Sequence, residues 1–234
     1  MSGEVHGPGE YYASAAGAAA ARVVAQRLRA MWPSLPGMSV LGIGHTAPYL
    51  GLWRAETSRC IALSPVQLGL PPAIPEAPGS SLVAEDDALP FPDLCFDRIL
   101  LLHGLEMAEN ARRLLREIWR VLKDDGRVLV VATNRRGLWA HAEHTPFGHG
   151  QPYSPGQVTR LLTRHLFRVE RRDSALFTPP YAPFLRAAST WERAGHALWP
   201  ARHAGLAIVE ARKDLLAAAP AGAGAMRRRV LVPA

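Results

Sequence analysis

The segment 134–153 gathers side chains that could hold a substrate. It reads NRRGLWAHAEHTPFGHGQPY and combines hydrogen-bond donors with aromatic rings. Connections of this length are more often functional than idle, and we expect this one to form a lid loop over a pocket. Its candidate substrate residues are Arg135, Arg136, Trp139, His144, His149 and Tyr153.

The two neighbouring arginines of this segment suit a negatively charged acceptor. A guanidinium can bind a carboxylate or a phosphate through two parallel hydrogen bonds. The alternative for Arg135 and Arg136 is a solvated turn with capping roles, and the sequence gives the two interpretations about equal weight.

A second candidate group, His103 and Glu106, follows the largely apolar segment 96–102. An imidazole exchanges protons near neutral pH, so His103 with Glu106 is the candidate general base. A structural histidine without a chemical role is an alternative of at least equal weight.

Metal binding is not predicted. His141, His144 and His149 lie near Glu143 in the sequence, but their spacing matches no helical pair of ligands. Histidines at the edge of a lid or of the core are the favoured interpretation.

Other catalytic patterns are missing from the sequence. It has no GxSxG elbow, no Ser-His-Asp spacing and no GxxxxGKS/T loop, which argues against hydrolases and P-loop proteins. Cys60 and Cys95 lack the CxxC spacing, which suits reduced thiols and predicts neither a disulfide framework nor a zinc site.

The sequence predicts a cytoplasmic protein. Glu4 and Glu10 stand where a secretory signal requires Lys or Arg. The alanine-rich stretch 13–21 is too short and too weakly apolar to cross a bilayer. A length of 234 residues suffices for one substantial core, and we expect no membrane span.

The positive charge is concentrated in the second half of the chain. The formal net charge is +7, with a balance of −3 over residues 1–100 and +10 over residues 101–234. This pattern favours an anionic acceptor or partner. Nucleic acid is the less favoured partner, because no basic stripe interleaved with aromatic residues is present. The sequence does not indicate an oligomeric state.

Alternating strands and helices must position these candidate residues. The apolar pattern predicts helices over 14–31, 108–122 and 184–198, and one after the capping box Ser154-Pro155-Gly156-Gln157. It predicts strands over 38–43, 60–63, 82–84, 96–102, 127–134, 167–170 and 205–211. This alternation is typical of an α/β fold with a doubly wound, mostly parallel sheet. Such sheets bind ligands at the carboxyl ends of their strands.

We expect a single domain over residues 1–216. Residues 1–33 would form a helical N-terminal extension, and residues 71–80, with four prolines, a loop. The segment 217–234 is expected to be a disordered basic tail ending in Arg227, Arg228 and Arg229.

Three motifs identify a resemblance to a known family. They are LPFPD at 89–93, FD at 96–97 and RVLKDDGR at 120–127. Together they resemble the class I S-adenosylmethionine-dependent methyltransferases, and their type 11 branch in particular. The resemblance implies a Rossmann-like, seven-stranded, mostly parallel sheet with helices on both faces, and S-adenosylmethionine as the cofactor.

The resemblance also implies which residues surround the methionine end of the cofactor. In this family a glycine-rich turn after the first strand brings the backbone close to it, and Gly44 matches the first glycine of that turn. The resemblance therefore implies cofactor-binding roles for Gly42, Gly44 and His45. Gly42 stands where the family usually has an acid. Thr46 stands where a second glycine is usual, which predicts an atypical turn.

The nucleoside end is matched in part. Ala62 stands where the family usually carries the acid that holds the ribose hydroxyls, and the loss of that pair predicts weaker binding. Glu85 matches the acid near the adenine, and Asp86 lies beside it.

The leading hypothesis from the sequence is a methyltransferase acting on a small or medium acceptor. One alternative is a catalytically inactive protein of the same fold that binds or regulates. A further alternative is an RNA-modifying methyltransferase, which depends on the positive charge alone. A fold by itself does not decide among these functions.

Overall fold

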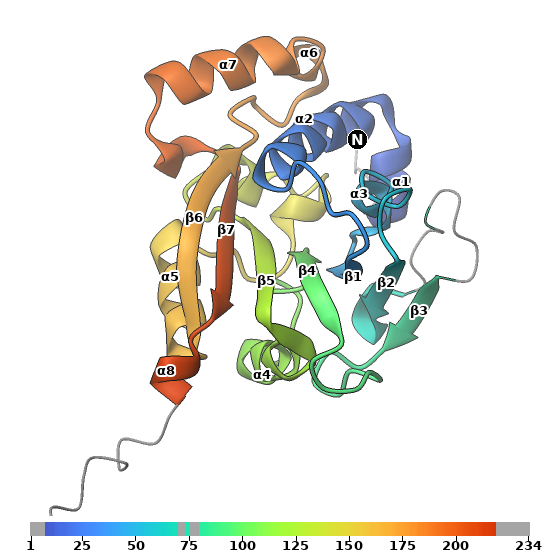
Figure 1. Cartoon of the computed structure of the whole chain (residues 1–234). Helices are drawn as coiled ribbons and strands as arrows, with labels where there is room; N and C mark the ends of the chain where they lie inside the picture. Colours follow the sequence, from blue (N-terminus) through green and yellow to red (C-terminus); the bar gives the residue numbers. More distant parts are fainter. Residues whose placement is uncertain (1–7, 70–73, 75–79, 219–234) are drawn as a thin grey trace, which may run out of the picture.

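The computed structural model describes residues 8–69, 74 and 80–218, which build a seven-stranded sheet with helices on both faces (Figure 1). The strand order is β3-β2-β1-β4-β5-β7-β6. The strands are β1 (Ser39–Gly44), β2 (Arg59–Pro65), β3 (Ser81–Ala84), β4 (Phe96–Leu102), β5 (Leu122–Thr133), β6 (Phe167–Ala175) and β7 (Leu206–Lys213). All pairs are parallel except those of β7, which runs antiparallel to β5 and β6. The predicted fold class is confirmed.

The helices divide between the two faces. They are α1 (Pro8–Ala13), α2 (Ala15–Met31), α3 (Ala47–Leu50), α4 (Ala111–Val121), α5 (Pro155–Arg164), α6 (Ala182–Leu185), α7 (Ala188–Leu198) and α8 (Leu215–Ala218). Short 3-10 turns occupy Val66–Leu68, Leu138–His141, Pro146–Gly148 and Ala201–His203. None of the helices in the described part of the chain has the length and hydrophobicity that crossing a membrane requires.

Two apolar cores sandwich the sheet, because successive strand residues point to opposite faces. Val40 of β1 belongs to the core that α2 covers with Val24 and Leu28. Its neighbour Leu41 belongs to the other core, beneath α4 and α5. Burial on both faces explains why the central strands read as continuous apolar runs.

Several element boundaries differ from the predictions. The helix expected over 108–122 begins at Ala111, because the side chain of Asn110 accepts hydrogen bonds from the next backbone amides and caps it. The strand expected from Arg127 begins at Leu122, so Asp125 and Gly126 lie within β5 and not in a turn. The helix expected over 184–198 is divided into α6 and α7.

Some other predictions are confirmed, and some concern residues outside the described ranges. The capping box of α5 is present, with Ser154 and Gln157 hydrogen-bonded reciprocally. The proline segment 71–80 lies outside the described residues except at positions 74 and 80, as does the tail from 219 onward. The helix expected over 14–31 is α2, and α1 before it is a separate short helix within the segment 1–33 that was expected to be helical.

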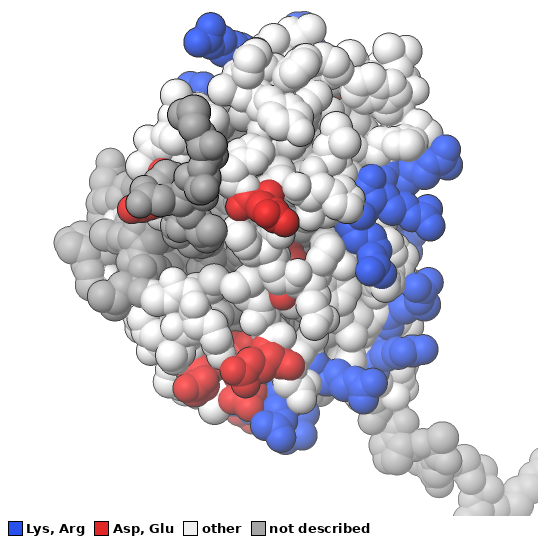
Figure 2. All heavy atoms as spheres, turned by 180° about the vertical axis from the view of Figure 1, so that it is seen from behind, with Lys and Arg blue, Asp and Glu red and all other residues white. Residues whose placement is uncertain are grey.

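The charged side chains are segregated on the surface. Seen from behind, Lys and Arg side chains gather along one edge, and acidic side chains gather at the lower end (Figure 2). That edge carries α5 and β6, whose exposed arginines include Arg160, Arg164, Arg168 and Arg172. In this view, therefore, part of the positive charge of the second half lies along the edge formed by α5 and β6.

Candidate functional site

The turn after β1 and the end of β4 are locked together at the carboxyl edge of the sheet. The His45 backbone amide donates to the Leu102 carbonyl at 2.9 Å. Gly44 has a φ of +89°, and a Cβ atom there would lie only 2.1 Å from the same carbonyl oxygen. Glycine is therefore required at this position by both conformation and space. His103, the first residue after β4, has a left-handed φ of +57°. Such a φ is unusual for a residue with a side chain of this size.

Tyr12 of α1 covers this junction. Its ring stacks on that of His45, with ring centres 4.7 Å apart and planes within 10°. Its hydroxyl lies 2.9 Å from Nε2 of His103 and is the donor if that nitrogen is unprotonated. One tyrosine thus contacts both the residue that follows β1 and the residue that follows β4.

Burial keeps both histidines neutral. It lowers the pKa of His45 to about 4. It lowers the pKa of His103 to about 3, and the nearby His45 adds to this effect. A neutral imidazole can accept the hydrogen bond from Tyr12, but a group with so low a pKa is a weak base near neutral pH.

Glu106 lies close enough to Tyr12 to add to the rise of the Tyr12 pKa, which is mainly due to burial, and is itself 4% exposed. Its Oε1 accepts from the Thr133 backbone amide at 2.5 Å, which ties the segment after β4 to the end of β5. Burial raises the pKa of Glu106. Its Oε2 is buried and has no hydrogen-bond partner among the described residues.

The segment 134–153 is anchored at both ends and lies against this group of residues. The Tyr153 amide donates to the Thr133 carbonyl at 2.9 Å, and Asn134 donates to the Ala204 carbonyl at 2.8 Å. In between, the buried Phe147 packs on His103, with ring centres 4.7 Å apart. The segment therefore lies over the ends of β4 and β5.

Its candidate substrate residues do not all face the same way. Trp139 is buried, and its indole N–H donates to the Thr178 carbonyl at 2.7 Å, so it packs in the core. Arg135, Arg136 and His144 are exposed. His144 lies within 2.9 Å of the Pro180 carbonyl and stacks on Tyr181.

Two further candidates of this segment are half-buried. Tyr153 lies close enough to Glu106 for that carboxyl to help raise its pKa, although burial is the larger cause. His149 is half-buried as well. In the described part of the chain, no three His, Cys, Asp or Glu side chains come together as metal ligands.

The atypical turn has a structural explanation. A Cβ atom on Gly42 would lie 2.1 Å from Oγ1 of Thr46, so the threonine side chain fills the space that a side chain at position 42 would need. Ala62 pairs with Gly42 across β1 and β2 and is completely buried. The small residues at 42 and 62 are therefore sterically compatible with the threonine at 46, whose side chain fills the space beside Gly42.

The two acids after β3 differ in exposure. Glu85 is exposed, whereas Asp86 is 4% exposed and its Oδ2 has no hydrogen-bond partner among the described residues. Burial raises the pKa of Asp86, and its acidic neighbours add to this.

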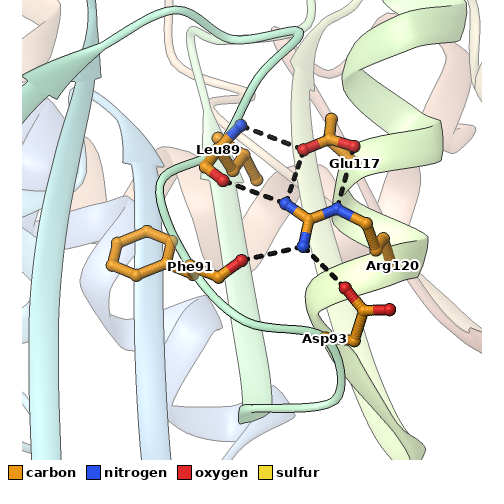
Figure 3. A network of polar contacts seen from close by, with 5 residues as sticks. All are labelled: Leu89, Phe91, Asp93, Glu117 and Arg120. Carbon is orange, nitrogen blue, oxygen red and sulfur yellow. Dashed lines mark hydrogen bonds and ion pairs between the residues drawn. The ribbon is translucent and has the colours of Figure 1, made fainter.

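The motifs at 89–93 and 120–127 are joined by a single arginine (Figure 3). The Arg120 guanidinium donates to the carbonyls of Leu89 at 2.9 Å and Phe91 at 2.8 Å. It also pairs with Asp93 at 2.8 Å and with Glu117 at 2.7 Å. Glu117 in turn accepts from the Leu89 amide at 3.0 Å. These motifs fix the loop between β3 and β4 on α4 and thereby hold Glu85 and Asp86 at the sheet edge.

Comparison with known proteins finds a family model that part of the chain matches. Residues 41–130 match the model of the methyltransferase domain family. This segment, which is less than half of the chain, is therefore similar to a methyltransferase domain. S-adenosylmethionine is the cofactor of that family. No curated protein matches the sequence.

Solved structures share the fold at low identity. A possible histamine N-methyltransferase from Thermotoga maritima is 16% identical, with a TM-score of 0.59, and the match covers 88% of this chain and 94% of that one. A chain of the Haloferax volcanii complex between the activator Trm112 and a methyltransferase is 18% identical, with a TM-score of 0.63 and coverage of 91% and 99%. The [4+2]-cyclase SpnF is 19% identical, with a TM-score of 0.53 and coverage of 82% and 80%.

The methyltransferase domain fits S-adenosylmethionine in part. At the adenine end, Asp86 offers a buried carboxyl oxygen with no partner among the described residues. At the ribose, Ala62 offers no polar group. At the methionine end the glycine turn is present, but the ring of Tyr12 rests directly on His45 of that turn. The residues therefore suit the cofactor at both ends, with the methionine end covered by α1.

Tyr12 is the site residue that sequence reasoning missed. It lies in a segment before the predicted helix and matches none of the family motifs. The available signal was the pair Tyr11-Tyr12, which stands between Glu10 and a long run of small residues and shortly before the capping residue Ser14. Two adjacent aromatic residues there indicate that the segment packs against another part of the protein, but they do not identify that part.

Proposed function

We propose that the protein transfers a methyl group from S-adenosylmethionine to a nucleophilic atom of a small acceptor. The observation that supports this most is the convergence of Gly44, His45, His103 and Glu106 at the carboxyl edge of β1 and β4, within a methyltransferase domain. When bound, S-adenosylmethionine supplies an activated methyl group on a positively charged sulfur. The role of the chain is then to orient the acceptor and exclude water, and orientation alone can supply about 7–11 kcal/mol.

Within this proposal, Glu106 is better suited than His103 to receive a proton from the acceptor. The pKa of His103, lowered to about 3, makes it a weak base, and its Nε2 already contacts Tyr12. The raised pKa of Glu106 brings it nearer to the range in which a catalytic carboxyl group works. We therefore assign His103 a positioning role and Glu106 the proton-accepting role, for acceptors that carry a proton at the attacked atom.

Ligand-induced stabilisation tests the proposed cofactor. S-adenosylmethionine and S-adenosylhomocysteine should both raise the melting temperature, because a ligand at 100 times its Kd adds about 2.7 kcal/mol. ATP, which has the nucleoside but no methionine end, serves as the control and should have a smaller effect. If neither sulfur compound shifts the melting temperature at millimolar concentration, the proposal is wrong.

The role of Glu106 can be tested with Glu106→Gln, which keeps the shape and removes the proton-accepting oxygen. Once an acceptor is known, kcat should fall by about 10²–10⁴-fold, while the Kd of S-adenosylhomocysteine should stay within a few fold. Equal loss of cofactor binding and turnover would instead assign Glu106 a structural role, through its bond to Thr133.

A second candidate function is binding without catalysis. Ala62, which cannot hold the ribose hydroxyls, favours it. So does the SpnF structure, which shows that this fold also occurs in a cyclase. This alternative predicts that a bound small molecule stabilises the protein but that no methyl group is transferred.

A further inference from the structure

We propose that Tyr12 controls entry to the cofactor site: with α1 folded down, its ring occupies the place that the methionine end of S-adenosylmethionine needs, and binding requires α1 to move away. This inference rests on the proposed function, because it concerns the same site.

The contact distances leave no room for a ligand beneath Tyr12. A ring-centre separation of 4.7 Å with nearly parallel planes is direct stacking, so no further layer of atoms fits between Tyr12 and His45. The hydroxyl is likewise in direct contact with His103 at 2.9 Å. Tyr12 therefore bridges the two strand ends between which the family resemblance places the methionine end.

α1 packs closely on the residues beneath it, which we call its seat, but some buried polar atoms in this contact lack hydrogen-bond partners among the described residues. Tyr11 and Tyr12 pack edge-on against Phe147, with ring centres 6.2 and 6.3 Å apart. The hydroxyl of Tyr11 and Nε2 of His45 are buried without a hydrogen-bond partner among the described residues. A buried polar atom without a partner weakens the packing that contains it. These atoms lower the free energy that is needed to displace α1 from its seat.

Any movement of α1 relative to α2 must take place at the single residue that joins them. α1 has six residues, and Ser14 alone separates it from α2. The Ser14 hydroxyl donates to the Tyr11 carbonyl and accepts from the Gly17 amide, so it is bonded on both sides of the junction. At Gly17 the two helices nearly touch, since a Cβ atom would lie 2.0 Å from the Tyr11 carbonyl oxygen.

Two variants open this seat by different means. Tyr12→Ala removes the ring itself. Gly17→Ala leaves every site residue in place but inserts a methyl group where the Tyr11 carbonyl now lies, so α1 must shift. A site that is open only part of the time binds with an affinity reduced by its open fraction. Both variants should therefore lower the Kd for S-adenosylhomocysteine. The decrease is about tenfold if about nine-tenths of the unmodified protein is in the closed form.

The titration is run calorimetrically on the full chain with S-adenosylhomocysteine as the probe. The control is Phe184→Ala, an aromatic truncation on α6, where the ring packs on Trp191. Its Kd should match that of the unmodified protein. Tyr12→Phe keeps the stacked ring without the hydroxyl and should give a Kd between those of the unmodified protein and Tyr12→Ala.

Hydrogen exchange of the α1 amides supplies a readout independent of affinity. If α1 leaves its seat on binding, S-adenosylhomocysteine should speed exchange at residues 9–13. Slower exchange together with weaker binding by Tyr12→Ala would overturn the proposal, because it would indicate that Tyr12 contacts the bound ligand. Unchanged affinity in both variants would also overturn it and leave the cofactor assignment intact. Failure of every form to bind would overturn both.

Discussion

Glu192 shows how a single carboxyl can make stability depend on pH away from the candidate site. It lies on α7 and is 5% exposed, and its Oε1 accepts from the Phe177 amide at 2.6 Å. Burial raises its pKa to about 7, with backbone hydrogen bonds acting in the opposite direction. The folded protein therefore holds this proton more tightly than the unfolded chain does, and folding is favoured while the carboxyl is protonated.

Glu192→Gln should remove this pH dependence. The stability that Glu192 contributes in its protonated form is complete below the pKa of the unfolded chain, near 4.5, and is lost as the pH rises through about 7. The free energy of unfolding of the variant should match that of the unmodified protein at low pH. Above pH 7 it should exceed it, by on the order of 3 kcal/mol. Urea unfolding at pH 4.5, 6 and 8 measures the difference, and a constant difference would contradict this prediction.

The candidate site could be predicted from single residues only where a family motif or a strand end marked them. Gly44, His103 and Glu106 were predicted, because each follows a recognisable strand, and the structure places them together. Trp139 was predicted as a substrate residue but is held in the core by Thr178. Tyr12 was missed, because its partners His45 and His103 are distant in sequence and no local pattern reports such a contact.

The loop between β3 and β4 depends on Arg120 more than on its own residues. It contains prolines and little regular structure, so its own backbone offers few hydrogen bonds. Arg120 supplies them from α4, by binding the carbonyls of Leu89 and Phe91 (Figure 3). The family motifs at 89–93 and 120–127 are therefore two halves of one contact, and their recurrence reflects architecture more than chemistry.

Arg120→Ala should destabilise the protein by about 2–3 kcal/mol, because it leaves two carbonyls and the Glu117 carboxyl without their charged partner. Hydrogen exchange should rise in the segment 85–93. Arg112→Ala is the matched control, since Arg112 lies exposed on the same helix and forms no ion pair within the described residues. Equal melting temperatures for the two variants would show that the contact contributes little.

Most elements were predicted, and the errors share a physical cause. Period and capping signals located β4 and α2 to within a residue or two of their ends, and they located the start of α5. The break between α6 and α7 was missed, because the apolar pattern continues across it. β5 begins earlier than expected because its first residues pair with β4 at Phe96, which a turn-like Asp-Gly pair does not indicate.

At the scale of the whole molecule, α2 is fastened at one end and carries α1 at the other. At its C-terminal end, the Trp32 indole donates to Glu210 of β7 at 2.6 Å, and Arg171 of β6 pairs with the same carboxyl at 2.6 Å. At its N-terminal end, α2 is joined to α1 over the carboxyl edge of the sheet (Figure 1). The part of the molecule that covers the site is thus joined to a helix whose opposite end is held by hydrogen bonds to β6 and β7.

The position of α1 has a practical consequence for anyone handling the protein. An affinity tag, a fluorophore or a fusion partner attached ahead of Pro8 is joined to α1, the helix that carries Tyr12. α8, by contrast, lies at the opposite corner of the molecule (Figure 1). Reporters and purification handles belong after α8, where they leave the mouth of the site undisturbed.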